Sequence, residues 1–524
     1  MPRDTMGDVK NRFPSSLLIL SIAAVFLSGC SPKPPVEDGT LVIALPGAPS
    51  SIDPRLATDA YGAQILQMTH ASLIRMDAAG NPVPDLAERW EERSPTEIVV
   101  RIRDGLRFHD GRRLSSADVR YTFEWILDPA NRSPHRATYE KIRAIATPDS
   151  RTVVFHLSEP FAPFLTGLVR GIVPDGSRAT GYSPPIGAGP YRVDDFQQDT
   201  AIRLSRYEGY HGGAPGIERV VVKFLPDSNV RFLELKKGSV NFVLNGVDPD
   251  LIPPALENGN LVMEEAPGSN ASYLGFNLRD TVLSDHRVRR AIAFAIDREA
   301  IVRTLWKGHA DLADSILAPA FWAHADGIPP VRHDPFAAMR LLDEAGYRDP
   351  DGDGPKPRFR LTYKTSQNEL RRQIATVIQE QLRKVGIAVE VQSFEWGTFF
   401  SDIKEGNFQL YALTWVGILD PDIYHYAFHS GQFPPRGANR GGYRNPEVDR
   451  LVEEARREPS REKRKGLYKK VQVLLARDLP VFPLWINRNI LVRDRRLSGF
   501  VITPDENYTS VKEMVILGEK GEGK

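Results

Sequence analysis

Two strand–helix–strand patterns, one in each half of the chain, restrict the fold more than any other feature of the sequence. In the second half, a strand predicted over residues 359–364 is followed by Ser-Gln-Asn-Glu at 366–369, the pattern of a helix capping box. An apolar stripe at helical spacing comes next, made of Leu370, Ile374, Val377, Ile378, Leu382 and Val385. Gly386 is well placed to end that helix, and residues 387–392 then alternate between apolar and polar side chains as in a strand.

The pattern in the first half is shorter. It consists of a strand over residues 217–225, a helix cap at Asp227 or Ser228, a short helix that ends before Gly238, and a strand over residues 240–244. Because the two units lie far apart in the sequence, we expect two separate α/β lobes rather than one continuous sheet. A helix is also predicted from about Asp59 to Ile74, and Ser-Ser-Ala-Asp at 115–118 matches the capping box of another helix. A chain of 524 residues has room for about three domains or lobes.

Charge and cysteine content exclude several classes of protein. The chain has 68 Lys and Arg against 67 Asp and Glu, a net charge of +1, whereas a general nucleic-acid binder would carry a basic excess. We therefore expect no nucleic-acid partner. The single cysteine, Cys30, excludes an internal disulfide and Cys-rich zinc sites.

The N-terminus has the parts of a secretory signal. A basic segment over residues 1–14 precedes an apolar run over residues 15–27, which is shorter than the ~20 residues that a membrane-spanning helix needs. The run ends in Leu-Ser-Gly-Cys, which resembles the lipobox of bacterial lipoproteins, in which the cysteine receives a diacylglyceryl group. We expect a signal peptide over residues 1–29, a lipid anchor on Cys30 and a Pro-rich tether over residues 30–39. The alternative is a plain signal peptide with an incidental cysteine.

Motifs of familiar catalytic sites are absent from the sequence. It contains no Gly-x-Ser-x-Gly, no His-Glu-x-x-His and no Walker A loop. Gly-Ala-Gly at 187–189 resembles the start of a dinucleotide-binding loop, but Pro190 and Arg192 do not fit the rest of that motif. We therefore predict no catalytic residue and no cofactor.

Two further patterns partly match metal sites. The acidic turn at residues 349–354 matches the start of a calcium loop, but Arg360 stands where the bidentate carboxylate should be. His425 and His429 would share one face of a helix, and no third ligand is evident nearby. We therefore predict no metal site.

Five groups of segments, in order along the chain, carry a family resemblance. They are Ser-Ile-Asp-Pro at 51–54 with Gly-Asn-Pro-Val-Pro-Asp-Leu-Ala-Glu-Arg-Trp at 80–90; Arg-Ile-Arg-Asp-Gly-Leu-Arg-Phe-His-Asp-Gly at 101–111 with Ser-Ala-Asp-Val at 116–119; Gly-Ala-Gly-Pro-Tyr at 187–191; Leu-Gly-Phe-Asn at 274–277 with Val-Arg-Arg-Ala-Ile-Ala at 288–293 and Ala-Ile-Asp-Arg at 295–298; and Gly-Gly-Tyr-Arg-Asn-Pro-Glu-Val-Asp at 441–449. Together they resemble the bacterial extracellular solute-binding proteins of family 5, the dipeptide- and oligopeptide-binding proteins of ABC importers.

The resemblance implies a type II-like periplasmic-binding-protein clamp of two α/β lobes, with an extra subdomain inserted in the first lobe. Lobe I would comprise residues 40–55, 187–274 and 485–524, the inserted subdomain residues 56–186, and lobe II residues 275–484. Two crossings, near residues 271–277 and 485–489, would form the hinge. A ligand would be captured between the lobes by hinge closure and delivered by the closed form to membrane permease subunits.

The resemblance also implies where the ligand binds. In peptide-binding members an extended ligand pairs with a short strand of the second lobe, so that main-chain hydrogen bonds give affinity that ignores side chains. The implied ligand-binding residues are Asp59, Ala60, Tyr61, Tyr273, Asn277, Thr414, Trp415, Val416, Gly417, Asp420 and Asp422. Trp415 either walls the pocket or lies in the core, and Tyr61 either faces the ligand or packs under its helix.

One position departs from the family pattern. Peptide binders typically place an aspartate just after this strand to pair with the α-ammonium group of the peptide, whereas this chain has Ile418 and Leu419 there. Asp420 and Asp422 follow and resemble the structural Asp-Pro-Asp turn of the family. A buried ammonium group without a partner is costly, so recognition of a free amino terminus is in question. The ligand is then a peptide held in another way, or a sugar, an opine or a nickel chelate.

The expected function is that of the lipid-anchored, monomeric binding protein of an ABC importer, in the periplasm or on the outer cell surface. Its partners would be a peptide or other small solute and the permease subunits. Two alternatives remain. One is a solute sensor that passes its signal to a receptor, and the other is an exported enzyme on the same scaffold.

Overall fold

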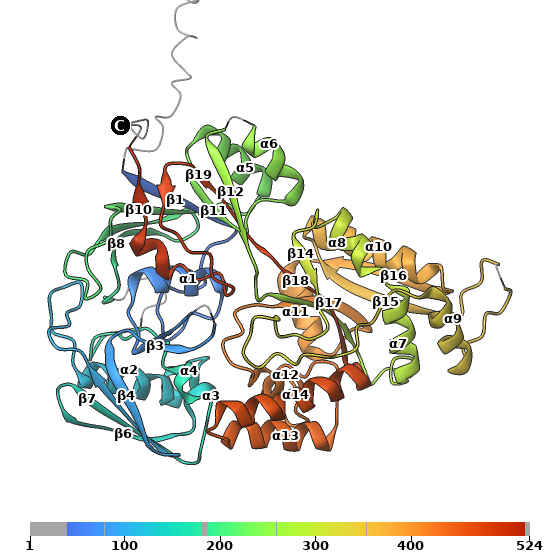
Figure 1. Ribbon diagram of the computed structural model, residues 1–524, viewed down its shortest axis with the longest axis horizontal. Helices are drawn as coiled ribbons and strands as arrows, with labels where there is room; N and C mark the ends of the chain where they lie inside the picture. Colours follow the sequence, from blue (N-terminus) through green and yellow to red (C-terminus); the bar gives the residue numbers. More distant parts are fainter. Residues whose placement is uncertain (1–38, 78, 180–185, 258, 353, 519–524) are drawn as a thin grey trace, which may run out of the picture.

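The computed structural model describes residues 39–77, 79–179, 186–257, 259–352 and 354–518. The chain forms two bodies side by side, each built on a large β-sheet, and a smaller sheet extends the first body (Figure 1). The expected signal peptide, Cys30 and residues 30–38 of the tether lie outside the described residues. Within the described ranges, no helix is long and apolar enough to cross a membrane.

The sheet of lobe I is assembled from distant parts of the chain, in the order β12-β19-β11-β1-β10-β9-β8. Its strands are β1 (Thr40–Leu45), β8 (Tyr191–Gln197), β9 (Ala201–Arg206), β10 (Arg219–Phe224), β11 (Phe242–Leu244), β12 (Leu261–Ala266) and β19 (Asn489–Asp494). β1 is parallel to both β10 and β11, which α5 (Ser228–Lys237) connects. The first predicted strand–helix–strand unit is confirmed, because Asp227 accepts the N–H of Val230 at 3.0 Å and Gly238 ends the helix with a φ of 72°.

α1 (Ala60–Thr69) follows β1 and is shorter than the predicted helix, which extended from about Asp59 to Ile74. The helix ends because the carbonyl of Thr69 accepts the N–H of Gly189 at 3.0 Å. A Cβ atom on Gly189 would lie 2.4 Å from the carbonyl carbon of Thr69, so only glycine permits this approach. Ile74 instead begins β2 (Ile74–Met76), which pairs with β3 (Pro82–Pro84).

The inserted subdomain has its own antiparallel sheet and its own core. The strand order is β4-β5-β7-β6, and α2 packs on this sheet. Its elements are β4 (Ala87–Ser94), β5 (Glu97–Ile102), α2 (Ser116–Leu127), α3 (Arg136–Tyr139), β6 (Ile142–Asp149), β7 (Thr152–Leu157) and α4 (Phe164–Gly167). The predicted capping box of α2 is confirmed, with Asp118 accepting the N–H of Ser115 at 2.7 Å. In its core, Phe155 makes edge-to-face contacts with Phe123 and Phe164, with 5.4 and 5.2 Å between ring centroids.

The sheet of lobe II follows the order β14-β18-β13-β17-β15-β16. Its strands are β13 (Ala271–Phe276), β14 (Ala310–Leu312), β15 (Phe359–Ser366), β16 (Ile387–Phe394), β17 (Leu410–Trp415) and β18 (Val481–Asn487). α10 (Glu369–Arg383) joins β15 to its parallel neighbour β16, as the second predicted unit requires. The predicted cap is wrong, because Ser366 is still part of β15 and Asn368 caps the helix by accepting the N–H of Arg371 at 3.1 Å.

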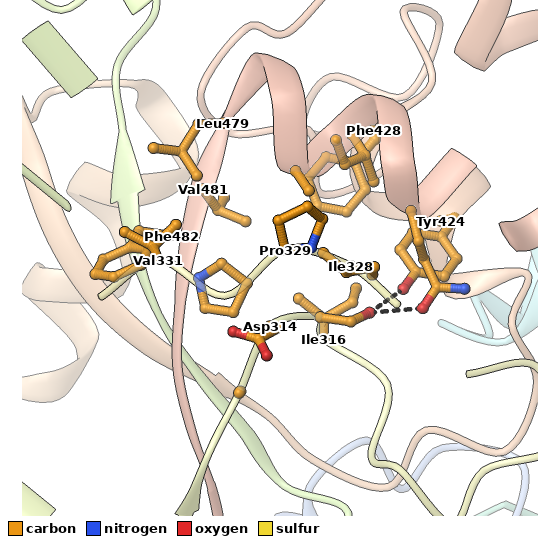
Figure 2. A pocket seen from close by; sticks show the side chains of 16 residues that line it. Asp314, Ile316, Ile328, Pro329, Val331, Tyr424, Phe428, Leu479, Val481 and Phe482 are labelled. Atoms are coloured by element: carbon orange, nitrogen blue, oxygen red, sulfur yellow. Dashed lines mark hydrogen bonds between the residues drawn. The ribbon is translucent and has the colours of Figure 1, made fainter. Parts of the chain in front are cut away.

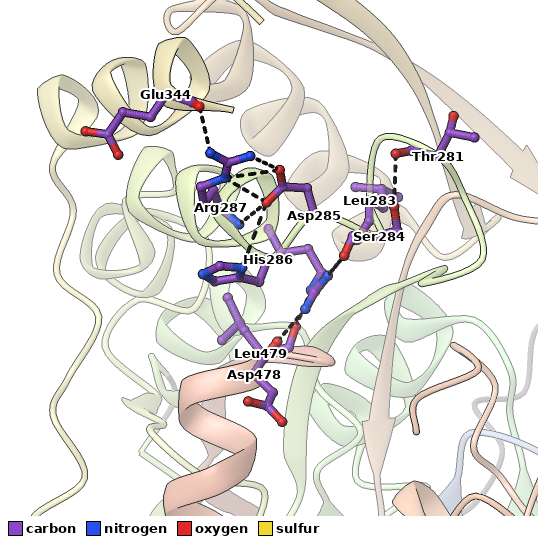
Figure 3. Close-up of polar contacts among 10 residues, drawn as sticks. Thr281, Leu283, Ser284, Asp285, His286, Arg287, Glu344, Asp478 and Leu479 are labelled. Carbon is purple, nitrogen blue, oxygen red and sulfur yellow. Dashed lines mark hydrogen bonds and ion pairs between the residues drawn. The ribbon is translucent and has the colours of Figure 1, made fainter. Parts of the chain in front are cut away.

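The other helices of lobe II cover its sheet and fill the space beside it. They are α7 (His286–Ala295), α8 (Arg298–Thr304), α9 (Pro335–Glu344), α11 (Trp396–Glu405), α12 (Ile423–Phe428), α13 (Pro446–Arg457) and α14 (Arg461–Asp478). α7 is fastened to the end of α14 through Arg289, which is 4% exposed and donates to the carbonyl of Leu479 at 2.9 Å. At the start of the same helix, Asp285 pairs with Arg287 at 2.6 Å (Figure 3).

The chain passes between the two large sheets twice. The first passage covers residues 267–270 between β12 and β13, and the second is Arg488 between β18 and β19. The expected lobe boundaries, after Leu274 and after Leu484, differ from these positions. The expected inserted subdomain, residues 56–186, also begins too early, because Ile65 and Met68 of α1 pack in the core of lobe I. β13 and β18 pair with each other from Ala271 to Gly275, so both strands belong to the sheet of lobe II.

Candidate functional site

A cavity of about 440 Å³ lies between the two lobes, within the ~300–1,000 Å³ typical of small-molecule sites. One wall consists of the outer face of α1 and the loop over residues 505–509, both in lobe I. The inserted subdomain supplies a second wall, and the residues directly after β17 in lobe II supply the third. Because both lobes contribute, relative movement of the lobes would enclose or release a solute.

The α1 wall presents small and amide side chains. Asp59 lines the cavity but also caps α1, accepting the N–H groups of Gly62 at 2.8 Å and Ser50 at 2.9 Å. Ala60 is exposed at the first turn and lines the cavity, as does Gln64, whose Oε1 is buried without a hydrogen-bond partner in the described part of the chain. Tyr61 is not among the lining residues and packs against the apolar core of lobe I.

The lobe II wall is the end of β17. Val416, which is 52% exposed, and Gly417 line the cavity after the strand has left the sheet. Gly417 has a φ of +65°, which turns the chain away from the sheet direction. Within the described residues, the backbone N–H and C=O groups of Val416 and Gly417 have no hydrogen-bond partner. Unpaired backbone groups beside a cavity are available to a ligand.

Four of the implied residues are held by contacts within lobe II and are not among the residues that line the cavity. Trp415 stacks on Tyr273 at 5.8 Å between ring centroids, and Arg440 lies over its indole at 5.1 Å. Thr414 is within 3.0 Å of the hydroxyl of Ser272, from β13. The other two are Tyr273, which is 1% exposed, and Asn277, whose amide donates to the carbonyl of Phe408 at 2.8 Å.

Both aspartates after β17 are already paired with arginines. Asp420 accepts from Arg464 at 2.7 Å, and Asp422 lies 3.1 Å from Arg456. Burial raises the pKa of both carboxyl groups, to about 7 for Asp422, while the nearby guanidinium groups act in the opposite direction. Asp420 lines a separate space of about 160 Å³ between lobe II and the inserted subdomain.

The departure from the family pattern has a clear structural counterpart. Ile418 is 8% exposed and packs in the apolar core of lobe II, while Leu419 lines the inter-lobe cavity. An apolar side chain therefore lies on the cavity wall where the family pattern would place an acid.

Sequence reasoning missed several charged groups that line the cavity. Asp85 lies within residues 80–90, in the first of the five groups, and is not among the implied ligand-binding residues. It accepts the N–H of Ser72 at 3.0 Å and lies 3.7 Å from Arg75. Glu506 lies in the loop from lobe I, and burial raises its pKa to about 7. No local pattern could have indicated Glu506, because its position depends on where the C-terminal loop packs.

His425 and His429, the two histidines of the possible metal-binding pattern, have other partners. Nε2 of His425 accepts from Arg456 at 3.1 Å, and Nε2 of His429 lies 3.1 Å from Glu453. In the described ranges, no group of three or more His, Cys, Asp and Glu side chains is placed to hold a metal ion.

A second cavity inside lobe II is too small for a solute. Its volume is about 40 Å³, and the hydroxyl of Tyr424 lies 2.7 Å from that of Ser315 at its edge (Figure 2). Ser315 also donates to Gln472 at 2.8 Å. A space of this size holds about one water molecule. The inter-lobe cavity is therefore the candidate functional site.

Two α/β lobes with a cavity between them define a protein that captures a solute. The chain belongs to a family described as bacterial extracellular solute-binding proteins, family 5 Middle, whose model matches residues 81–434. It is 28% identical to the oligopeptide-binding protein AppA of Bacillus subtilis, over 95% of this chain and 97% of that protein. It is 26% identical to the dipeptide-binding protein of Escherichia coli, over 90% of this chain and 93% of the relative.

Solved structures agree with this assignment. The structure of Bacillus subtilis AppA in complex with a nonapeptide matches with a TM-score of 0.81 and 27% identity, covering 93% of this chain and 100% of that one. NikZ from Campylobacter jejuni in complex with Ni(L-His) matches with a TM-score of 0.80 and 25% identity, covering 92% and 100% of the two chains. The two-lobed fold with an inserted subdomain is thus that of the family.

Proposed function

We propose that this protein is the substrate-binding lipoprotein of an ABC importer and that it captures peptides between its lobes. The observation that carries this proposal is the free backbone of Val416 and Gly417 on the cavity wall. A peptide in extended conformation can add its own N–H and C=O groups there, continuing the hydrogen-bond pattern that β17 makes with β13. Such bonds give affinity for a peptide main chain without selecting its side chains.

The relatives support peptides over the other solutes. Two of them are named as oligopeptide- and dipeptide-binding proteins, and one solved neighbour holds a nonapeptide. A further solved neighbour, DppA from Helicobacter pylori, holds the peptide STSA at 25% identity and a TM-score of 0.78. A nickel chelate, as in NikZ, is the second candidate because that neighbour shares the fold to a similar degree.

The rest of the proposal concerns export and partners. Cleavage of the signal before Cys30 and acylation of its sulfur would fix the protein to a membrane outside the cytoplasm, with the proline-rich tether as a spacer. The protein would act as a monomer and present its closed form to the permease subunits. Globomycin, which blocks lipoprotein signal cleavage, would then cause the uncleaved form to accumulate.

A calorimetric screen tests the peptide proposal. The purified chain is titrated with an equimolar pool of random tetrapeptides, with a sugar pool and with Ni²⁺ plus histidine. We expect heat of binding with the peptide pool alone, and a rise in melting temperature equivalent to about 2.7 kcal/mol at a hundredfold excess over Kd. Binding of Ni²⁺–histidine without binding of peptides would overturn the proposal.

A further inference from the structure

Glu506 occupies a fixed position on the lobe I wall of the inter-lobe cavity. The loop that carries it is tied to lobe I, since Asn489 donates to the carbonyl of Thr503 at 2.8 Å and Tyr508 N–H donates to Gln67 on α1 at 2.8 Å. The loop is also tied to the first passage between the lobes, where Ser269 donates to the carbonyl of Pro504 at 2.8 Å. Glu506 itself has a φ of +58°, so this loop holds it in a backbone conformation that non-glycine residues adopt infrequently.

The carboxylate of Glu506 has an amide donor but no cation. The side-chain amide of Asn270, also in the passage between the lobes, donates to its Oε1. In the described part of the chain, no Lys, Arg or His forms an ion pair with it, and it interacts electrostatically with Asp505, Tyr61 and Tyr508. A half-buried carboxylate beside a like charge is costly without a counter-ion.

The cations elsewhere on the cavity wall have other partners. Arg75 lies 3.7 Å from Asp85, and Lys512 lies 2.6 Å from Glu513. Arg170 donates to the carbonyl of Pro54 at 3.1 Å and packs against the ring of His135. None of them forms an ion pair with Glu506, so a cation for its ionised form would come from the solute.

Two further wall atoms lack partners. Oε1 of Gln64 on α1 is buried without a hydrogen-bond partner among the described residues, and so is Nε2 of His70, a side chain that is 6% exposed. Burial lowers the pKa of His70 to about 3, so its ring is neutral and does not supply a charge to the cavity. The wall near α1 therefore offers the amide oxygen of Gln64 as a free acceptor, and an ammonium group brings three donors.

We infer that Glu506 binds the cationic group of the solute, and that for a peptide this group is the free α-ammonium. The inference rests on the proposed function, because it places the ligand in the inter-lobe cavity. It also resolves the departure after β17: the acid that lobe II lacks at Ile418 and Leu419 is supplied by lobe I, next to the passage between the lobes. A solute whose amino group is blocked would leave Glu506 unpaired in the closed form.

The test compares two peptide pools and two variants of the full chain. The pools are random tetrapeptides with a free amino terminus and the same pool after N-acetylation. The variants are Glu506→Gln, which removes the charge but keeps the size of the side chain and one acceptor oxygen, and Glu390→Gln, the same change at an exposed acid on β16 that does not line the cavity. Circular dichroism and the melting temperature of the unliganded variants show that both fold.

We expect Glu506→Gln to raise the Kd for the free-amine pool by about 10- to 100-fold, the loss typical of a charged hydrogen bond. Glu390→Gln should change that Kd less than threefold. The acetylated pool should bind the wild type and Glu506→Gln with the same weak affinity.

Three outcomes would contradict the inference. If Glu506→Gln binds the free-amine pool as the wild type does, Glu506 is not the anchor, although the proposed function stands. If the acetylated pool binds the wild type as tightly as the free-amine pool, no ammonium partner exists. If neither pool binds the wild type, the proposed function fails, and the inference fails with it.

Discussion

The guanidinium group of Arg464 lies 2.7 Å from the carboxylate of Asp420, and the two side chains are 8% and 11% exposed. The acid that follows β17 is thus neutralised from α14 of its own lobe. Replacement of Arg464 by Met would leave a buried carboxylate without its cation, which typically costs ~3–5 kcal/mol. We expect a loss of this order in the free energy of unfolding, measured by urea denaturation.

Arg450 offers a matched control on the neighbouring helix α13. It pairs with Glu447 at 2.8 Å, but the two side chains are 56% and 52% exposed, and exposed pairs contribute about 0–1 kcal/mol. Arg450→Met should therefore change stability little. Equal losses in the two variants would show that the Asp420–Arg464 pair has no special role in lobe II.

A larger side chain at Ala63 should abolish binding without affecting the fold. Ala63 is exposed on α1 and lines the inter-lobe cavity, so the ring of Phe would project into the space that the ligand needs. We expect the Kd for the tetrapeptide pool to rise more than tenfold. The free energy of unfolding of the unliganded protein should change by no more than about 0.5 kcal/mol, the range of surface substitutions. Thr376→Phe, on the exposed face of α10, is the control and should bind normally.

Contacts between the inserted subdomain and α13 should favour the closed form. Arg456 lies over the ring of Phe161 at 5.0 Å, and its carbonyl accepts the N–H of Ala162 at 2.7 Å, where the two parts meet (Figure 1). Phe161→Ala would remove a cation–π contact of about 0.5–1 kcal/mol. We expect a two- to fivefold rise in Kd and a larger radius of gyration of the free protein in small-angle X-ray scattering.

The control for this closure prediction is Phe336→Ala, at a ring on α9 that is 79% exposed. It should leave both quantities unchanged. A Phe161→Ala variant with unaltered Kd and unaltered scattering would mean that this contact does not contribute to closure.

His425 should make the protein sensitive to acid. Its ring is 8% exposed, and burial together with the adjacent Arg456 lowers its pKa to about 3, from a usual value near 6.5. Between pH 6.5 and pH 3 the unfolded chain takes up a proton at this site and the folded chain does not, so stability falls as the pH falls. The slope from one such group is at most about 1.4 kcal/mol per pH unit.

Urea denaturation of His425→Gln over this pH range tests the effect. Glutamine can still accept from Arg456, and the variant should lose stability less steeply than the wild type on acidification. The other buried histidines contribute equally to both proteins, so the difference between the two curves isolates His425. His286→Gln, at a side chain that is 65% exposed, should follow the wild type, and a His425→Gln curve parallel to the wild type would refute the assignment.

Local signals predicted much of the fold because they act over a few residues. The caps at Asp227 and Ser115 and the parallel pair formed by β15 and β16 depend on hydrogen bonds or apolar spacing that the sequence displays directly. α1 was predicted too long because its end is set by Gly189, more than a hundred residues away. The predicted cap at Ser366 is wrong because pairing with β16 extends β15 over this residue, and no local pattern reveals that pairing.

The site was less predictable than the fold. The resemblance placed Asp59, Ala60, Val416 and Gly417 near the ligand, and all four line the cavity. The resemblance could not indicate Glu506, because its burial without a counter-ion results from the packing of the C-terminal loop against α1 and the passage between the lobes. The assignment of all five residues as ligand contacts remains a prediction for the binding measurements.

The late position of β18 and β19 in the chain also governs when the protein can fold. β18 lies between β13 and β14, and β19 lies between β11 and β12, so each is an interior strand of its sheet. Residues 481–494 are thus needed to complete both lobes, although they come within the last tenth of the chain. Pairing between strands so far apart in the sequence is slow, because the chain between them loses conformational entropy before the new contacts stabilise it. A ribosome must therefore have made nearly the whole polypeptide before either lobe can close its core.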